Sequence, residues 1–350
     1  MNPAVIAACP RVSVLMAVRD GGPFLAEAIA SIRQQSFRDW ELVAVDDGST
    51  DGSNDVLRAA ARGEMRIRVF RQGPLGLVPA LNRAVAEARG DFFARMDADD
   101  RSHPDRLGRQ LAFLAVHPEV GVLGTAVRRF GAAGGIWRRP EDDAALRAAL
   151  LFEAPLAHPT VMLRRSLWEA AGSEGYREDF RAAEDIDLWE RLAPHTQFAN
   201  LRVPLLDYRV HAAQVTRVAT EMMARNGARV RRRWLQQLGL EPTEREMTRH
   251  EAVAWLRTGA AVELEAAGTW LARLSAANDS SRLLDPGALA QLLGRRWFEF
   301  CNAHSRLGRE AWRIYRRAAL GNHSGAPRVR RLRFALLCAL RQPAKGGRHD

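Results

Sequence analysis

The chain has 350 residues, of which 47% are hydrophobic and 27% are charged, and its formal net charge is +11. This composition predicts a globular protein with room for two domains and excludes a disordered chain. Three widely spaced cysteines, Cys9, Cys301 and Cys338, suit neither a disulfide framework nor a zinc site, so we expect a reducing compartment.

The N-terminal ten residues lack a basic segment, so we expect no secretory signal peptide, and no apolar run approaches the ~20 residues of a membrane-spanning helix. The positive charge is concentrated in one part of the chain. Residues 217–350 carry 25 Lys+Arg against 12 Asp+Glu, whereas residues 1–216 carry 27 against 29. A basic region of this kind attracts acidic lipid, nucleic acid or phosphorylated substrates.

Strand-like and helical patterns alternate along the first hundred residues. Residues 12–18 are β-rich, and Pro23 opens a helix that keeps apolar residues at helical spacing through Gln35. Further strands are predicted at residues 41–45, 67–70 and 91–94, each separated from the next by a helical pattern. This order with short connections predicts a parallel α/β sheet with right-handed crossovers.

Polar and mostly acidic side chains follow three of these strands. They are Arg19 and Asp20, then Asp46 and Asp47, then Asp97, Asp99 and Asp100. The carboxyl ends of parallel strands are where ligands bind in such sheets. Neither a Gly-x-Gly-x-x-Gly fingerprint nor a P-loop is present, which disfavours the usual dinucleotide and P-loop functions.

The segment from Arg95 to Asp100 holds three carboxylates in four residues. In an extended backbone Asp97 and Asp99 point to the same side, and paired oxygen donors suit Mg²⁺ or Mn²⁺. The alternative is a solvated acidic turn that caps the helix beginning near Pro104.

Several ordered motifs resemble those of the family 2 glycosyltransferases of the GT-A fold. The motifs are residues 12–18, 43–53, 81–82 and 94–100. The resemblance implies an α/β GT-A fold, Rossmann-like with a mostly parallel sheet flanked by helices, over residues 11–216. It also implies an inverting transfer of a sugar from a nucleotide-diphosphate sugar, UDP-sugar by default, to a hydroxyl acceptor such as a cell-surface glycan or a lipid-linked saccharide.

The resemblance assigns roles to the strand ends. Asp46 or Asp47 would accept a hydrogen bond from the nucleotide base, Asp97 would lie against the ribose or metal, and Asp99 would ligate the metal. Arg95 would steady Asp97 or a phosphate. The other residues that it places at the nucleotide sugar are Ala17, Arg19, Asn82 and Ala98. A capped strand-to-helix turn at residues 46–49 is the alternative, and it is compatible with nucleotide binding.

Glu184 and Asp185 begin a predicted helix, where acidic residues favour the helix dipole in any protein. The resemblance makes them the acceptor-side pair, with Asp185 as general base. His211 would complete the metal shell, and an imidazole ligand would favour Mn²⁺ over Mg²⁺; a structural histidine is the alternative. His158, at the start of a strand predicted at residues 158–163, is a secondary candidate.

Residues 217–350 are predicted to be helical throughout, with one continuous helix over residues 253–274. Near the C-terminus a basic run, residues 328–333, precedes an apolar run, residues 334–340. This segment predicts either a helix lying on an anionic membrane leaflet or a terminal helix packed on the protein itself.

The main hypothesis is therefore a cytoplasmic sugar transferase dependent on Mn²⁺ or Mg²⁺, soluble or peripheral on the inner face of the membrane. A sugar-phosphate nucleotidyltransferase is the first alternative, although Arg19-Asp20-Gly21-Gly22 is a poor phosphate loop. A basic nucleic-acid-binding protein is the second. No nucleic-acid partner is expected, because the C-terminal arginines accompany no zinc-finger or RNP pattern.

Overall fold

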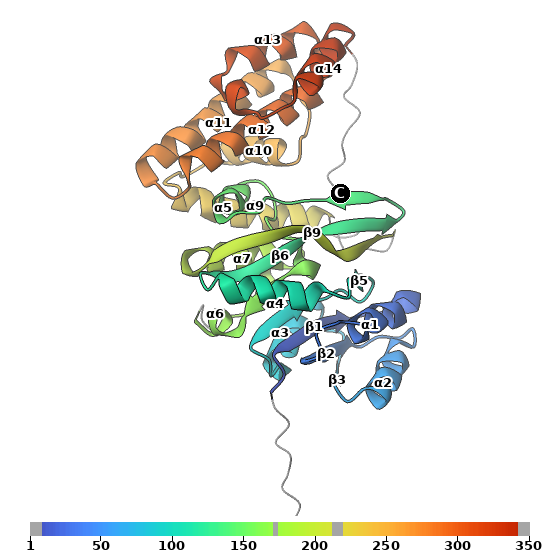
Figure 1. Ribbon diagram of the computed structural model, residues 1–350. Helices are drawn as coiled ribbons and strands as arrows, with labels where there is room; N and C mark the ends of the chain where they lie inside the picture. The colour runs from blue at the N-terminus through green and yellow to red at the C-terminus, as the bar shows by residue number, and fades with distance from the viewer. Residues whose placement is uncertain (1–8, 171–173, 212–219, 342–350) are drawn as a thin grey trace, which may run out of the picture. The chain divides into compact units, whose positions relative to one another are not determined.

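The computed structural model describes residues 9–170, 174–211 and 220–341 (Figure 1). It divides into two units. The first comprises Met1–Leu146 and Pro155–Gly227, and the second comprises Arg147–Ala154 and Ala228–Asp350. The boundary predicted between residues 216 and 217 falls within residues 212–219, outside the described residues, so the division into 11–216 and 217–350 stays a prediction.

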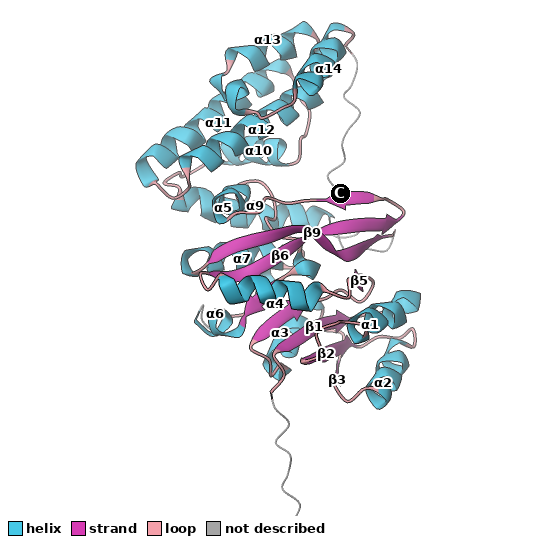
Figure 2. Cartoon of the chain, viewed as in Figure 1, coloured by secondary structure: helices cyan, strands magenta, loops and turns pink. Residues whose placement is uncertain are grey.

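The sheet of the first unit begins with four parallel strands in the order β3-β2-β1-β4. Figure 2 labels the first three of them, β3, β2 and β1. These strands are β1 (Val12–Val18), β2 (Trp40–Asp47), β3 (Ile67–Gln72) and β4 (Phe92–Arg95). The helices between them are α1 (Leu25–Arg33), α2 (Ser53–Gly63) and α3 (Leu77–Glu87). The predicted alternation of strand and helix is confirmed.

The sheet then continues with strands of both directions. Its order beyond β4 is β8-β6-β9-β5, with β7 paired to β6, and β4–β8 and β8–β6 are antiparallel whereas β6–β9 is parallel. These strands are β5 (Arg101–Ser102), β6 (Val120–Gly131), β7 (Gly135–Trp137), β8 (Met162–Arg164) and β9 (Gln197–Val210). The accompanying helices are α4 (Arg106–Val116), α5 (Asp143–Ala149), α6 (Arg165–Ala170) and α7 (Glu184–Leu192).

Period-two alternation in β1 explains why the sheet is covered on both faces. Val14 and Met16 belong to the same buried cluster as Ile29 of α1 and Leu107 of α4. Leu15 points to the opposite face, where α3 packs against β1 and β2. A strand that is apolar at successive positions is what a sheet buried on both faces requires.

Strand register brings the polar strand ends to one edge. Val18 pairs with Asp46, and Asp46 in turn pairs with Arg71 of β3. On the other side of β1, Leu15 pairs with Arg95, the last residue of β4. The segments that follow β1, β2, β3 and β4 therefore all leave the sheet at the same edge.

The described residues from 228 to 341 contain helices and turns, which confirms the predicted helical C-terminal region. Its helices are the C-terminal part of α9 (Thr220–Gln237), α10 (Glu244–Ala254), α11 (Ala261–Ser281), α12 (Pro286–Ala303), α13 (Arg309–Arg317) and α14 (Arg328–Ala339). Thr243 and Glu246 form a capping box on α10, and Asp285 caps α12. Among the described helices, none combines the length and apolarity that crossing a membrane requires.

Two predicted elements differ from the structure. His158–Thr160 forms a 3-10 turn, and only Met162–Arg164 is strand, because Pro159 lacks the N–H that a central ladder needs. The continuous helix predicted over residues 253–274 is interrupted between α10 and α11. Leu256 there adopts a left-handed conformation with φ of 51°, which ends a right-handed helix.

Candidate active site

The acidic segment after β4 gathers its carboxylates as predicted. One oxygen from each of Asp97, Asp99 and Asp100 lies within 4.8 Å of the others. Burial raises the pKa of Asp97, Arg95 opposes that rise, and the charge of Asp99 adds to it. Burial also raises the pKa of Asp100 well above its usual value, with the charges of Asp97 and Asp99 as further causes. This cluster is electrostatically costly without a cation beside it.

The end of β9 holds this acidic segment in place. The backbone N–H of Arg209 donates to Asp100 Oδ1 at 2.8 Å, and its Nε donates to the Asp99 carbonyl oxygen at 2.8 Å. The Arg209 guanidinium also pairs with Glu27 of α1. His211, two residues on, has Nε2 2.8 Å from Asp99 Oδ2. His211 therefore lies next to the acidic segment, as the resemblance implied.

The donor set fits a divalent cation. The side chains of Asp97 and Asp99 are partly exposed, 30% and 27%. Asp100 Oδ2 is buried without a hydrogen-bond partner among the described residues. An orphaned buried carboxylate oxygen is unusual unless an ion or water satisfies it. Carboxylate oxygens with one imidazole nitrogen are ligands typical of Mn²⁺ and acceptable to Mg²⁺.

The two aspartates that end β2 are both engaged by the chain itself. Asp46 accepts from the Ser49 N–H at 3.0 Å and from the Asn54 side chain at 2.9 Å. Asp47 accepts from the N–H groups of Leu75 and Gly76 at 2.9 and 2.8 Å. Asp46 therefore closes a turn with Ser49, as the alternative predicted, but the N-cap of α2 is Gly52, which makes no side-chain cap hydrogen bond. Asp47 orders the loop between β3 and α3, which follows β3 at the same edge of the sheet.

Replacing Asp47 by asparagine is expected to loosen that loop. The amide offers one acceptor oxygen where the carboxylate offers two, so one of the Leu75 and Gly76 N–H groups loses its partner. Hydrogen exchange at the amide that loses its partner should become roughly 10–100-fold faster, since a hydrogen bond to a charged group contributes about 1.5–3 kcal/mol.

Mass spectrometry of the peptide that covers the loop measures this change. Asp55→Asn, at an exposed position in the first turn of α2, is the matched control and should leave exchange unchanged. Equal exchange in Asp47→Asn and the native protein would show that Asp47 does not order the loop.

Glu184 and Asp185 start α7 and lie in a partly desolvated environment. Burial raises the pKa of Glu184 to about 7, with the charge of Asp185 as the next cause. Burial also raises the pKa of Asp185, whereas the Ile186 N–H and the charge of Arg95 oppose that rise. Glu184 Oε2 is buried without a hydrogen-bond partner among the described residues. A carboxylate pair with raised pKa values suits proton transfer near neutral pH.

The raised pKa of Glu184 predicts how the free energy of unfolding changes with pH. Because its pKa rises from 4.5 unfolded to about 7 folded, its favourable contribution is complete below pH 4.5 and is lost as the pH rises to about 7. Relative to the native protein, Glu184→Gln should therefore gain roughly 2–3 kcal/mol of unfolding free energy between pH 5 and pH 8.

Denaturant unfolding at the two pH values measures this difference. Glu169→Gln, which removes an exposed carboxylate in α6, is the control and should follow the native protein at both pH values. A Glu184→Gln variant that shows the same pH dependence as the native protein would contradict the raised pKa.

Arg95 connects the acidic segment with the start of α7. It is 6% exposed and forms an ion pair with Asp97. Its charge also acts on the pKa values of Glu184 and Asp185, so all four groups lie within electrostatic reach. The loop that Asp47 holds also contacts the segment just before α7. There an Nη atom of Arg181 donates to the Leu75 carbonyl oxygen at 3.4 Å.

An aromatic cluster lies beside Arg95. His158 Nε2 is 2.9 Å from the Tyr176 hydroxyl, and the His158 ring meets the Trp189 ring at 6.0 Å. Burial lowers the pKa of His158 well below its usual value, with the charge of Arg95 as a second cause. Asn82 donates to and accepts from the backbone of Tyr176 at 2.8 and 2.9 Å. Asn82 is thus placed to hold Tyr176, with its amide already engaged.

The remaining predicted residues lie at the same edge with less defined partners. Arg19 is half exposed and lies 3.5 Å from Asp47, Ala17 is partly buried near the end of β1, and Ala98 packs against the sheet cluster. Sequence reasoning missed Tyr176 and Glu27. No local motif identifies these two residues, because their partners are distant in sequence. Arg209 lies two residues before His211, and the sequence assigned a role to the histidine alone.

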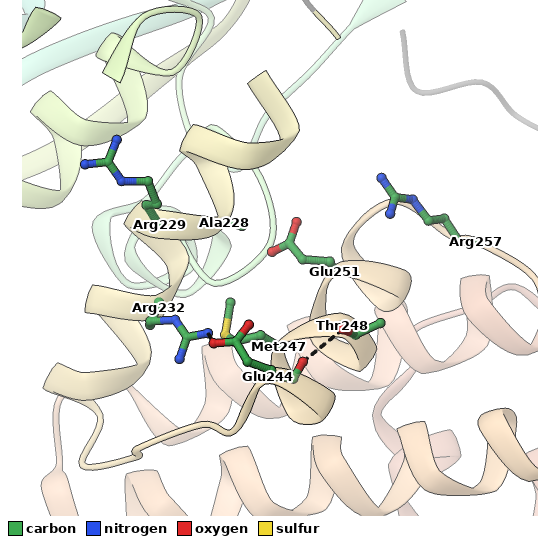
Figure 3. Close-up of a pocket in the computed structure, with 8 residues that line it drawn as sticks. All are labelled: Ala228, Arg229, Arg232, Glu244, Met247, Thr248, Glu251 and Arg257. Atoms are coloured by element: carbon green, nitrogen blue, oxygen red, sulfur yellow. Dashed lines mark hydrogen bonds and ion pairs between the residues drawn. The ribbon is translucent and has the colours of Figure 1, made fainter. Parts of the chain in front are cut away.

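The helical unit has a separate hollow of about 340 Å³ between α9 and α10. Figure 3 shows its lining residues, which are Ala228, Arg229, Arg232, Glu244, Met247, Thr248, Glu251 and Arg257. Arg232 pairs with Glu244 at 2.6 Å, and Glu251 accepts from Arg231 and from the Trp255 ring nitrogen. Because these charges are satisfied within the unit, we assign the chemistry to the edge of the sheet.

Comparison with known proteins points to one family. The sequence pattern of Glycosyl transferase family 2 matches residues 13–170. A putative glycosyltransferase of Bacillus subtilis, EpsE, is 37% identical over 186 residues, which cover 52% of this chain and 66% of that protein. The O-antigen biosynthesis glycosyltransferase WbnJ of Escherichia coli is 29% identical over 206 residues, which cover 57% of this chain and 80% of that protein.

Solved structures agree with the sequence comparison. Staphylococcus aureus TarS 1–349 in complex with UDP-GlcNAc matches with a TM-score of 0.56 at 16% identity, over 90% of this chain and 89% of that one. The mannosyltransferase PcManGT from Pyrobaculum calidifontis, in complex with GDP-Man and Mn²⁺, matches with a TM-score of 0.52 at 18% identity, over 95% and 87%. At these identities the likeness concerns the fold, and it confirms the predicted GT-A architecture.

Proposed function

The chain belongs to glycosyl transferase family 2 through its residues 13–170, and from this premise we propose that it is an inverting, metal-dependent sugar transferase. The donor is a nucleotide-diphosphate sugar, and the acceptor is a hydroxyl group. The observation that carries the proposal is the cluster of carboxylate oxygens after β4, from Asp97, Asp99 and Asp100, with His211 2.8 Å from Asp99 and the buried Arg95 paired with Asp97.

Asp97, Asp99 and His211 would hold Mn²⁺ or Mg²⁺, with Asp100 fixing the segment through Arg209. The ion, when bound, would neutralise the negative charge that develops on the departing nucleoside diphosphate. Arg95 would steady Asp97 from a buried position, and Arg19 lies where it could meet a phosphate. The PcManGT complex, which contains GDP-Man and Mn²⁺, supports this choice of cofactor.

For the donor we propose a UDP-sugar, supported by the TarS complexes with UDP and UDP-GlcNAc. Asp46 and Asp47 would contact the nucleotide base, and Ala17 and Ala98 would line its site. The acceptor is proposed to be a surface glycan or a lipid-linked saccharide, in line with relatives whose names include O-antigen and teichuronic acid biosynthesis.

Asp185 is the proposed general base. Its carboxylate takes the proton of the acceptor hydroxyl as the acceptor oxygen bonds to the anomeric carbon. The bond from that carbon to the diphosphate oxygen breaks at the same time, and its electron pair leaves with the nucleoside diphosphate. Attack from the face opposite the leaving group inverts the anomeric centre. Glu184, with a pKa of about 7, can then share with Asp185 the proton that came from the acceptor hydroxyl.

Thermal-shift screening of UDP-, GDP- and dTDP-sugars with and without Mn²⁺ tests donor and cofactor together. One nucleotide sugar should raise the unfolding temperature only when Mn²⁺ is present, and turnover should release the nucleoside diphosphate. Release of pyrophosphate from a nucleoside triphosphate would establish the nucleotidyltransferase alternative instead. Salt-sensitive binding to duplex nucleic acid, without any response to nucleotide sugars, would favour a nucleic-acid-binding protein.

A further inference from the structure

The exposed face of α14 carries an apolar stripe. Val329, Leu332, Leu336 and Leu340 are 76%, 70%, 58% and 57% exposed. Their spacing of three, four and four residues places them along one side of the helix. Four large apolar side chains exposed in one row are uncommon on the surface of a soluble protein unless a partner covers them. We call these four residues the α14 stripe.

The opposite face of α14 attaches the helix to its own unit. Phe334 is fully buried and Cys338 is 2% exposed. The Phe334 ring meets the rings of Trp312, Tyr315 and Phe298 at 5.4, 5.5 and 5.9 Å. The helix is therefore held by its packed face, and the α14 stripe contributes little to folding.

The segment that contains the α14 stripe is strongly basic. Residues 305–341 contain ten arginines and one acidic residue, Glu310. Within α14, Arg328, Arg331 and Arg333 are exposed and form no ion pair with a described residue. Helical spacing places Arg328 and Arg333 on the two flanks of the α14 stripe, whereas Arg331 lies on the side of Phe334 and Cys338. An apolar stripe flanked by unpaired arginines is typical of helices that lie in the interface of anionic membranes.

We propose that α14 docks on the surface of an anionic lipid bilayer, with the α14 stripe in the headgroup–acyl boundary and its arginines at the lipid phosphates. A second copy of the chain is a poorer occupant. A symmetric dimer through this face would set the same arginine-rich surface against itself, with one acidic residue to offset ten arginines. The inference is independent of the sugar-transfer proposal, and its test uses no activity.

Vesicle flotation of the full chain tests the proposal. The native protein should float with vesicles of phosphatidylcholine containing 30% phosphatidylglycerol, remain unbound with phosphatidylcholine alone, and bind more weakly at high salt. Leu332→Gln/Leu336→Gln should reduce binding to the anionic vesicles about tenfold or more. Met65→Gln/Val262→Gln removes two apolar side chains that are exposed elsewhere and should bind normally.

The arginines make a second, graded test. Arg328→Gln/Arg333→Gln should weaken binding by roughly 25-fold, about fivefold for each arginine. Arg58→Gln/Arg62→Gln, on the exposed surface of α2, is the matched control. In the native protein, hydrogen exchange in α14 should slow when anionic vesicles are added, which requires no variant.

Several outcomes would overturn the proposal. Equal binding to neutral and anionic vesicles would remove the role of the arginines, and unchanged binding of Leu332→Gln/Leu336→Gln would remove that of the stripe. A dimer in sedimentation that the same variant dissolves, with no vesicle binding by the native protein, would assign the stripe to a second copy of the chain.

Discussion

Asp99→Asn is expected to lower the rate of sugar transfer by on the order of 10³-fold, the largest loss predicted for one substitution at the acidic segment. Asp99 is partly exposed, contributes an oxygen to the carboxylate cluster and lies 2.8 Å from His211 Nε2. The asparagine keeps the shape and removes the charge that holds the cation. Nucleoside diphosphate release measured across a Mn²⁺ titration should show the loss at every metal concentration.

Asp91→Asn is the matched control. Asp91 is an exposed aspartate just before β4 that pairs with Arg11 on the surface, and its replacement should leave turnover unchanged. Near-native turnover in Asp99→Asn, with an unchanged dependence on Mn²⁺, would remove Asp99 from the metal site.

Asp185→Asn is expected to lower the rate of transfer by about 10²–10⁴-fold while leaving donor binding intact. The asparagine cannot take the acceptor proton, and loss of a general base costs about 10²–10⁴-fold in kcat. Asp185 lies at the start of α7, outside the segments proposed to bind the nucleotide, so the thermal shift produced by the donor and Mn²⁺ should be retained. A single-turnover assay with acceptor present would isolate the lost step.

Glu174→Gln is the control in the same part of the chain, since Glu174 is exposed and paired with Arg177. It should transfer normally. If Asp185→Asn transfers at the native rate, the base is another group. If it instead loses donor binding, Asp185 acts on the donor side.

The strands and helices around the parallel half of the sheet were predictable because each carries its own signal. Apolar runs such as residues 12–18 and 41–45 are long enough to identify as strands, and polar residues end them. The strands β5 and β7 contain only two and three residues, so they have no period to detect. Their existence depends on pairing with distant strands, which local sequence does not encode.

The residues of the site also differ in whether local sequence identifies them. Asp97, Asp99 and Asp185 were identifiable because they lie in compact acidic motifs that resemble those of a known family. Tyr176 and Arg209 were not, because their contacts span long sequence separations: Tyr176 meets His158 and Asn82, and Arg209 meets the acidic segment. Asn82 was predicted as a contact to the nucleotide sugar, and the structure gives its amide a partner inside the protein. Its role at the donor stays a prediction.

The loop that Asp47 holds has a consequence for how a ligand would associate. Both carboxylate oxygens of Asp47 already accept backbone N–H groups in the protein alone, and Asp46 fixes the neighbouring turn in the same way. This part of the edge is preorganised, so a nucleotide that contacts it need not offset the entropy of ordering a mobile loop. Association there should resemble the docking of a rigid surface, with affinity set by complementarity rather than by coupled folding.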